Sequence, residues 1–288
     1  MVKKAKTASS ISFACPKCKR PLRLMNNALC CNKCDRTYPI IDGIPDFLSG
    51  DEQASLASVF GGFSGITTLK RMTKRMDFLA PIYESQFFGS ILLKLSGVNS
   101  NISQFRDRIS SFHSKTLEGI SGSVLDVACG PATYRRIASP LRNVYGIDIS
   151  MGMLKQGKAY IERDNIQGVH LARARVEELP FENAVFDGVM CSGSLHLFPD
   201  TVLALREIAR TMKPAAPLSV QTFTSGKTVI NRFVQKHSWV HTFELVELQQ
   251  YLTEAGFDVF RHELDGIVLT FSARKAVSSL DQGFQGLP

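Results

Sequence analysis

The sequence lacks the features that place a protein across a membrane or in the secretory pathway. Its 288 residues contain no run of roughly eighteen apolar residues, the length that a helix needs to span a bilayer. The first ten residues are basic, with Lys3, Lys4 and Lys6, but they have no apolar stretch of the kind found in a secretory signal. We therefore expect a cytoplasmic protein with no membrane span.

Cysteine is scarce outside one short stretch. Only Cys129 and Cys191, of seven cysteines, lie outside residues 15–34. Within that stretch, two C-x-x-C knuckles are separated by twelve residues, and this spacing is typical of a tetrahedral zinc site. The predicted zinc ligands are Cys15, Cys18, Cys31 and Cys34.

Two alternatives to this ligand set stay open. Cys30 replaces Cys31 if the register of the second knuckle differs. A pair of disulfides would need an oxidising compartment, which nothing in the sequence indicates. So small a module buries little apolar surface, so a bound metal would supply the missing folding free energy.

Acidic residues are few at the N-terminal end. Residues 1–50 hold nine lysines and arginines against three aspartates, which is a net charge of +6; the other 238 residues add only +2 to the total of +8. A basic module of this kind suits docking on nucleic acid. The alternative is that these charges keep a small metal module in solution.

A strict G-x-G-x-x-G dinucleotide motif is also absent, although the chain has a strand and turn of that general kind. Residues 123–129 are typical of a buried central strand, which Gly130 closes, and Ala132–Ala138 begins a helix. A second strand, Val144–Asp148, ends in a carboxylate that can accept hydrogen bonds from a ribose. Asp126, inside the first strand, would repel a pyrophosphate but suits a cationic ligand.

These segments resemble the class I S-adenosylmethionine-dependent methyltransferases, in particular the type 11 branch and the ubiquinone and menaquinone C-methyltransferases. The resemblance covers roughly residues 68–275 and implies a methyltransferase that uses S-adenosylmethionine. It also implies an α/β, Rossmann-like, seven-stranded sheet with strand order 3-2-1-4-5-7-6 and an antiparallel last strand. The motifs that carry it are Asp126–Gly130, Gly146–Ser150, Glu178–Phe181 and Phe186–Met190.

Residues 13–48 resemble the zinc-ribbon domains that accompany or activate methyltransferases. A zinc ribbon also precedes the catalytic domain of bacterial rRNA guanine-N1 methyltransferases. That analogy is made at the level of the fold, and it implies RNA as one alternative substrate.

The methyltransferase resemblance also implies where the cofactor binds. Val176 is expected to contact the adenine through its backbone N–H and its side chain. Arg175 stands where the family commonly has an aspartate that accepts from the adenine amino group, and a guanidinium has no acceptor, so another group must take that hydrogen bond. The implied cofactor-binding residues are Asp126, Ala128, Cys129, Gly130, Asp148, Ile149, Met153, Arg175, Val176 and Cys191.

Residues 69–95, 192–200 and 225–243 are expected to select the methyl acceptor. In the ubiquinone-type family a segment resembling Asp77–Glu84 helps to cover the active site, so Tyr83 is a candidate for the wall of the acceptor pocket.

His196 follows the fourth strand, where a neutral imidazole can accept a proton, and a purely structural role is its alternative. His241 belongs to an insert that also holds Arg232, His237 and Trp239, for which an ordinary surface helix is the alternative. The catalytic candidates are therefore His196, Tyr83 and His241.

Composition and pattern divide the chain into four parts. They are a zinc ribbon at 11–48, a linker rich in Gly, Ser and Ala at 49–68, a methyltransferase domain at 69–275 with helical cap segments 69–118 and 225–243, and a tail at 276–288. Within the methyltransferase domain, helices are expected at 102–118, 150–161, 201–212 and 244–255, and further strands at 169–173, 185–191, 217–224, 257–264 and 267–274.

Three functions compete on this evidence. The first is methyl transfer to a small aromatic, quinone-like or lipid-like acceptor, and the second is methylation of an rRNA or tRNA base with RNA docked on residues 1–50. The third is a binding protein that keeps the cofactor but not the catalysis. Two departures from the family suggest it: Arg175, and Ala215–Ala216 at a turn where the family usually has Pro-Gly-Gly.

Overall fold

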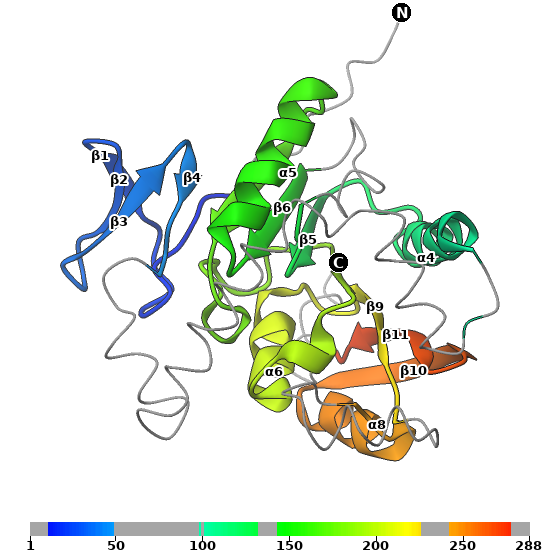
Figure 1. The fold of residues 1–288 in the computed structure, drawn as a ribbon. Helices are drawn as coiled ribbons and strands as arrows, with labels where there is room; N and C mark the ends of the chain where they lie inside the picture. The colour runs from blue at the N-terminus through cyan, green and yellow to red at the C-terminus, as the bar shows by residue number, and fades with distance from the viewer. Residues whose placement is uncertain (1–10, 49–97, 99–100, 132–142, 226–241, 278–288) are drawn as a thin grey trace, which may run out of the picture.

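The computed structural model describes residues 11–48, 98, 101–131, 143–225 and 242–277 (Figure 1). Several predictions from the sequence therefore fall outside the described residues. They concern the linker 49–68, most of the cap segment 69–118, the helix from Ala132, most of the insert 225–243 and most of the tail 276–288, and with them Tyr83 and His241.

Residues 11–48 form a small antiparallel sheet of four short strands. In order across the sheet these are β1 (Arg23–Met25), β2 (Ala28–Cys31), β3 (Arg36–Ile41) and β4 (Ile44–Pro45). Asn26 and Asn27 connect β1 to β2 with φ of 47° and 58°, which is the left-handed backbone that a tight two-residue hairpin requires. We call this four-stranded unit the ribbon.

The main sheet has seven strands in the order β10-β11-β9-β8-β5-β6-β7. Renumbered along the domain, this order is the predicted 3-2-1-4-5-7-6, and the last strand is antiparallel to both of its neighbours. The Rossmann-like fold is thus confirmed. The strands are β5 (Ser123–Val127), β6 (Asn143–Asp148), β7 (Val169–Arg173), β8 (Gly188–Ser192), β9 (Pro217–Phe223), β10 (Phe257–Asp265) and β11 (Val268–Lys275).

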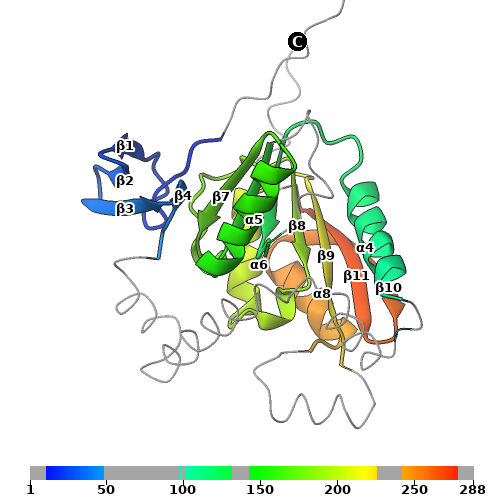
Figure 2. The same cartoon turned by 45° about the horizontal axis from the view of Figure 1, so that its top comes forward.

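Helices cover the sheet. Helix α4 packs on β9 and β11, α5 packs on β6 and β7, and α8 packs on β10 and beside α6 (Figure 2). Right-handed crossovers on the two sides of β5 send α5 and α6 to opposite faces. The described helices are α4 (Ile102–Thr116), α5 (Met151–Arg163), α6 (Thr201–Thr211) and α8 (Leu245–Glu254), with the short 3₁₀ turns η2 (Val176–Glu178) and η3 (Leu195–Leu197). None of these helices is long and apolar enough to cross a membrane.

The predicted element ends are close to the observed ones, with one informative difference. The fourth strand was expected from Val185, but β8 begins at Gly188. The backbone N–H groups of Val185 and Phe186 instead donate to the Thr211 carbonyl at 2.8 and 3.0 Å. The end of α6 therefore takes the hydrogen bonds that would have extended the strand.

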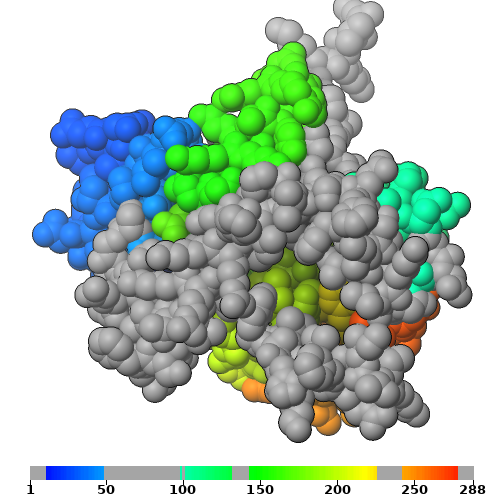
Figure 3. Space-filling model, viewed as in Figure 1, coloured from blue at the N-terminus to red at the C-terminus, as the bar shows by residue number. Residues whose placement is uncertain are grey.

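The ribbon packs directly against the edge of the main sheet at β7 (Figure 2), and in the space-filling view it adjoins α5 (Figure 3). The Phe47 N–H donates to the Arg173 carbonyl at 2.9 Å, and the Arg173 guanidinium pairs with the buried Asp46 carboxylate at 3.2 Å. Phe13 lies between Phe47 and Phe181, with ring centroids 5.6 and 5.5 Å away. The ribbon thus covers a sheet edge that would otherwise leave backbone groups unpaired.

A second set of ribbon contacts reaches α6. Lys19, beside the first knuckle, places its ammonium 2.5 Å from the Glu207 carboxylate and 3.3 Å from the Leu179 carbonyl. Glu207 also accepts from the Leu179 N–H at 2.9 Å and from Arg210 at 2.7 Å. One carboxylate therefore links the ribbon, α6 and the segment that follows η2.

The turn into β9 has an unusual backbone. Ala215 has φ of 60°, a left-handed conformation that costs an L-residue about 1–2 kcal/mol. Glycine adopts it freely. The Ala215–Ala216 pair, at which the sequence already departs from the family, thus retains the turn at the expense of backbone strain.

We expect Ala215→Gly to stabilise the protein by about 0.5–1 kcal/mol, the relieved strain less the extra chain entropy of glycine. Urea unfolding measures the change. Ala255→Gly is the matched control. Ala255 has φ of −83°, which strains no L-residue, so this variant should be less stable than the wild type. A destabilising Ala215→Gly substitution would contradict the observed backbone.

Candidate functional site

The four predicted zinc ligands come together in the ribbon. The sulfur atoms of Cys15, Cys18, Cys31 and Cys34 all lie within 4.8 Å of one another. Hydrogen bonding from the Arg20 backbone lowers the pKa of the Cys18 thiol to about 7, whereas the hydrogen bond with Cys18 raises the pKa of the Cys34 thiol to about 12 and burial raises that of Cys31. Four clustered thiols fit a structural zinc ion.

Cys30 is not one of the ligands. Its sulfur lies 3.7 Å from the Thr37 hydroxyl, outside the four-sulfur cluster. The cluster contains Cys31 in the predicted register, and all seven cysteines are free thiols, so the structure contains no disulfide. The Tyr38 hydroxyl lies 3.4 Å from the Cys15 sulfur and anchors the first knuckle.

The predicted donor turn connects β5 to the chain that follows it. Ala128 and Gly130 both have positive φ, 52° and 56°, so the backbone doubles back at the carboxyl end of the strand. Among the described residues, a Cβ built on Gly130 would meet no atom within 4 Å. In the described part of the chain, the turn thus leaves open space where a ligand can approach the backbone closely.

Asp148 binds this turn to the next one. Its carboxylate accepts from the Gly130 N–H at 2.9 Å and from the Ser150 N–H at 2.8 Å. Ser150 in turn caps α5 by accepting from the Met153 N–H at 3.1 Å. The carboxylate therefore lies at the ends of two adjacent parallel strands, where nucleotide ligands bind in open α/β sheets.

Asp126 is fully buried in β5, between Gly146 of β6 and Met190 of β8. A carboxylate in such a place is expensive unless a cation lies near it. The arrangement suits a ligand with a positive charge, as the sequence predicted.

Cys129 and Cys191 are both buried, and burial followed by the charge of Asp126 raises the pKa of each thiol. A Cβ on Gly146 would lie 2.9 Å from the Cys129 sulfur, so this thiol packs against β6. Met153 is likewise buried beneath α5, whereas Ile149 is partly exposed. The side chains of these three buried residues belong to the core, which leaves their backbone for any contact with a cofactor.

The predicted adenine end follows β7. The Ala174 N–H donates to the Asp148 carbonyl at 3.1 Å, which holds the segment beside the second strand. Arg175 is buried and its guanidinium lies 3.5 Å from the Glu177 carboxylate. Burial raises the pKa of Glu177, against the effect of Arg175. The arginine thus forms a buried pair within the loop, with Val176 between the two partners.

His196 lies in η3, just beyond the carboxyl end of β8. It is 6% exposed, its Nδ1 is 3.3 Å from the Thr222 hydroxyl, and its ring meets Phe223 edge-on at 4.7 Å. Burial lowers the pKa of His196 to about 4. The imidazole is therefore neutral at physiological pH, and it is a weaker base than an ordinary histidine.

Stability should depend on pH through His196. Because the pKa is lowered in the folded state, His196 contributes fully above the unfolded value of about 6.5, and its contribution falls as the pH drops toward 4. Between pH 7 and 5 the free energy of unfolding should therefore fall by about 2 kcal/mol.

Urea unfolding at the two pH values tests this. His196→Asn should reduce the loss, while His262→Asn, at an exposed histidine, should leave it unchanged. If the free energy of unfolding fell by the same amount between the two pH values in His196→Asn and in the wild type, the buried neutral imidazole would be contradicted.

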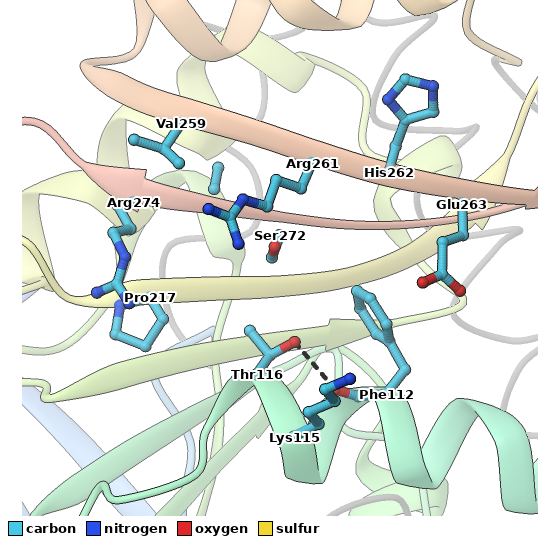
Figure 4. Close-up of a pocket in the computed structure, with 11 residues that line it drawn as sticks. Phe112, Lys115, Thr116, Pro217, Val259, Arg261, His262, Glu263, Ser272 and Arg274 are labelled. Atoms are coloured by element: carbon cyan, nitrogen blue, oxygen red, sulfur yellow. Dashed lines mark hydrogen bonds between the residues drawn. The ribbon is translucent and has the colours of Figure 1, made fainter.

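The described residues also form a groove of about 370 Å³ between α4 and strands β10 and β11 (Figure 4). Lys115, Arg261 and Arg274 contribute positive charge to it. Pro217, also in its lining, is the first residue of β9, so the groove lies where the parallel strands begin. The donor turn and His196 lie where they end, and the groove is not part of that site.

Some functional contacts were not found by sequence reasoning. Thr222 holds His196, and Ser194 lies 3.5 Å from the Ala128 carbonyl of the donor turn. The available signal was the succession of polar residues at the end of the predicted fifth strand, Gln221, Thr222 and Thr224, which is unusual in a buried strand.

Two family models match separate parts of the chain. A methyltransferase domain family (Methyltransf_11) matches residues 125–220, and the Trm112p-like protein family matches residues 13–43. An uncharacterized chloroplastic methyltransferase of Arabidopsis thaliana is 23% identical over 295 residues, which cover 91% of this chain and 78% of that protein.

Two further matches concern the methyltransferase part. A demethylmenaquinone methyltransferase of Listeria monocytogenes is 29% identical over 169 residues, covering 49% of this chain and 71% of that protein. The crystal structure of the [4+2]-cyclase SpnF aligns with a TM-score of 0.61 at 17% identity, covering 72% of this chain and 96% of that one. This structural likeness shows the fold.

The motifs, the strand order and both family matches agree with the four-cysteine cluster and with the open turn beside Asp148. The chain is an S-adenosylmethionine-dependent methyltransferase, with a class I methyltransferase domain matched over residues 125–220 and a Trm112p-like zinc ribbon matched over residues 13–43.

Proposed function

We propose that this enzyme methylates a small apolar acceptor of an aromatic, quinone-like or lipid-like kind. The observation that carries the proposal is the absence of charge beside the donor turn, in the described residues at the carboxyl ends of β8 and β9. Residues 192–198 and 221–225 contain no acidic or basic side chain other than the neutral His196. A surface of this kind suits an uncharged ring or chain better than a polyanion.

The donor would be held by the residues of the open turn. Asp148 would accept from the ribose hydroxyls, Asp126 would face the positive charge of the methionine part, and Val176 would contact the adenine. The Arg175–Glu177 pair would fix the shape of the adenine loop. The cofactor supplies a methyl group already activated by its sulfonium, so the protein has mainly to align the acceptor and exclude water.

His196 would orient the acceptor. Its Nδ1 is occupied by Thr222, which leaves Nε2 to bond an acceptor hydroxyl or carbonyl. With a pKa near 4 the imidazole is a poor proton sink at neutral pH. We therefore expect an electron-rich acceptor that needs no deprotonation by the enzyme. Tyr83 and His241 remain predicted contributors to the same pocket.

The Listeria relative is named for a demethylated menaquinone, and this supports a quinone-like acceptor for the present enzyme. The basic ribbon and its Trm112p-like character favour the second candidate, methylation of an RNA base with RNA held on residues 1–50. A cytoplasmic location stays a prediction.

Incubation with methyl-labelled S-adenosylmethionine separates the two candidates. One reaction contains a reduced naphthoquinone that lacks its ring methyl group, and the other contains unmodified rRNA. We expect labelled quinone product and unlabelled RNA. Label in the RNA alone would replace the small-acceptor proposal by the second candidate.

A further inference from the structure

The hairpin that joins β1 and β2 exposes aliphatic side chains to solvent. Leu24 is 67% exposed and Met25 is 53% exposed. The hairpin lies on the side of the ribbon away from the main sheet (Figures 1 and 2). We call residues 24–27 the ribbon tip. Its left-handed asparagines, Asn26 and Asn27, make a tight turn that presents these side chains outward.

The outer surface of the ribbon is basic because docking engages its acids. Asp42 pairs with Lys155 of α5 at 2.8 Å, and Asp46 pairs with Arg173 of β7. In the described sequence of the ribbon, Asp35 is the only other acidic residue. The exposed bases that have no ion pair within the described part of the chain are Lys17, Arg20, Arg23 and Lys33.

The tip and the bases are close together. Arg23 immediately precedes Leu24, and it pairs across the hairpin with Cys30, next to the zinc knuckle. Three residues of strand span roughly 10 Å, so the four-sulfur cluster lies about one Debye length from the tip. The other three bases lie within two residues of a cysteine of that cluster. Aliphatic side chains beside several bases are the pattern by which peripheral proteins bind anionic lipid.

The aromatic residues of the ribbon argue against single-stranded RNA as the partner at this surface. Phe13, Tyr38 and Phe47 are the aromatic residues among residues 11–48, and all three pack inward. Recognition of single-stranded RNA relies heavily on bases stacked on exposed aromatic side chains. The exposed side chains here are aliphatic.

We propose that the ribbon tip docks the enzyme on an anionic membrane surface, with Leu24 and Met25 among the upper acyl chains and the four bases at the lipid phosphates. The choice of a membrane rests on the proposed function, because a quinone-like or lipid-like acceptor is dissolved in one. The ribbon would then hold the catalytic domain close to its substrate.

Co-sedimentation of the full, zinc-loaded chain with vesicles tests the proposal. Vesicles of phosphatidylcholine with about one third phosphatidylglycerol should bind the wild type, and pure phosphatidylcholine should bind it at least tenfold more weakly. The double variant Leu24→Ser/Met25→Ser should lose about tenfold in affinity for the anionic vesicles, because it removes the apolar side chains that enter the acyl chains. The variant Arg23→Glu should also lose about tenfold, because one base near such a surface contributes about fivefold and the new acid is repelled by the lipid.

Val246→Ser is the matched control, because Val246 is 70% exposed on α8, and it should bind as the wild type does. Zinc content confirms that each variant keeps its ribbon. Equal binding to both vesicle types, or unchanged binding by the double variant, would overturn the proposal. So would tight binding of a labelled rRNA fragment that is lost in Arg23→Glu while anionic vesicles remain unbound.

The assay contains no acceptor and follows no methyl transfer. Failure to bind vesicles therefore leaves the small-acceptor function standing, and failure to methylate a soluble quinone leaves the docking result standing.

Discussion

Replacing Asp148 by alanine is expected to weaken the binding of S-adenosylmethionine by about 100-fold or more. The carboxylate would lose its bonds to the ribose hydroxyls, and hydrogen bonds to a charged group contribute about 1.5–3 kcal/mol each. It would also lose its bonds to the Gly130 and Ser150 N–H groups, so the donor turn would no longer be held in shape. Calorimetric titration measures the effect.

Two matched variants separate the lost ribose contacts from the lost shape of the donor turn. Asp148→Asn keeps an oxygen that can accept from one N–H but offers a donor toward the ribose, so it should retain the fold and still bind weakly. Asp164→Ala removes an acid at the far end of α5, where it caps the helix, and should bind the cofactor normally. Unchanged affinity in Asp148→Ala would remove the basis for the proposed donor site.

The second large effect concerns zinc. Cys15→Ser, or prolonged chelation, should unfold the ribbon, because structural zinc supplies roughly 10–16 kcal/mol in small zinc modules and whole domains are stable by only about 5–15 kcal/mol. Loss of the ribbon would uncover β7 and the apolar side chains on which Phe13 packs, Tyr145 and Phe181. The melting temperature of the catalytic domain should then fall by several degrees.

Cys30→Ser is the control for this prediction. Cys30 lies outside the four-sulfur cluster, so the variant should keep one zinc per chain and an unchanged melting temperature. Zinc loss in Cys30→Ser, or full zinc content in Cys15→Ser, would contradict the ligand set.

Local patterns predicted the parts of this protein that depend on neighbouring residues. The two knuckles have their ligands within four residues of each other, and the structure brings the same four sulfurs together. The strand order followed from the family resemblance, because the motifs mark the ends of particular strands. Ser150 as a helix cap was readable for a similar reason, since its hydrogen bond reaches only to Met153.

The docking of the ribbon could not be predicted, because it depends on pairs far apart in sequence. Asp46 meets Arg173 and Lys19 meets Glu207 across more than a hundred residues. In the sequence, each of these four residues is indistinguishable from an ordinary surface charge. The same holds for His196. A histidine after the fourth strand suggested a proton acceptor, and its burial and its contact with Thr222, which keep the imidazole neutral, were not readable from its neighbours in sequence.

The pairing of Arg175 was also missed from the sequence, although its partner is a near neighbour. From the sequence, a guanidinium at this position put the adenine contact in doubt. The buried Arg175–Glu177 pair shows that the charge is used within the loop itself. Arg175 and Glu177 are only two residues apart in the sequence. Their side chains nevertheless meet because the 3₁₀ turn η2 directs them toward each other, and this turn was not predicted.

The most direct test is a crystal structure with S-adenosylhomocysteine bound. We predict its ribose on Asp148, its amino-acid end near Asp126 and its adenine beside Val176. The sulfur should face a closed, uncharged pocket that includes His196 and Phe223. A cofactor bound away from Asp148, or a sulfur facing an open and basic surface, would contradict this account.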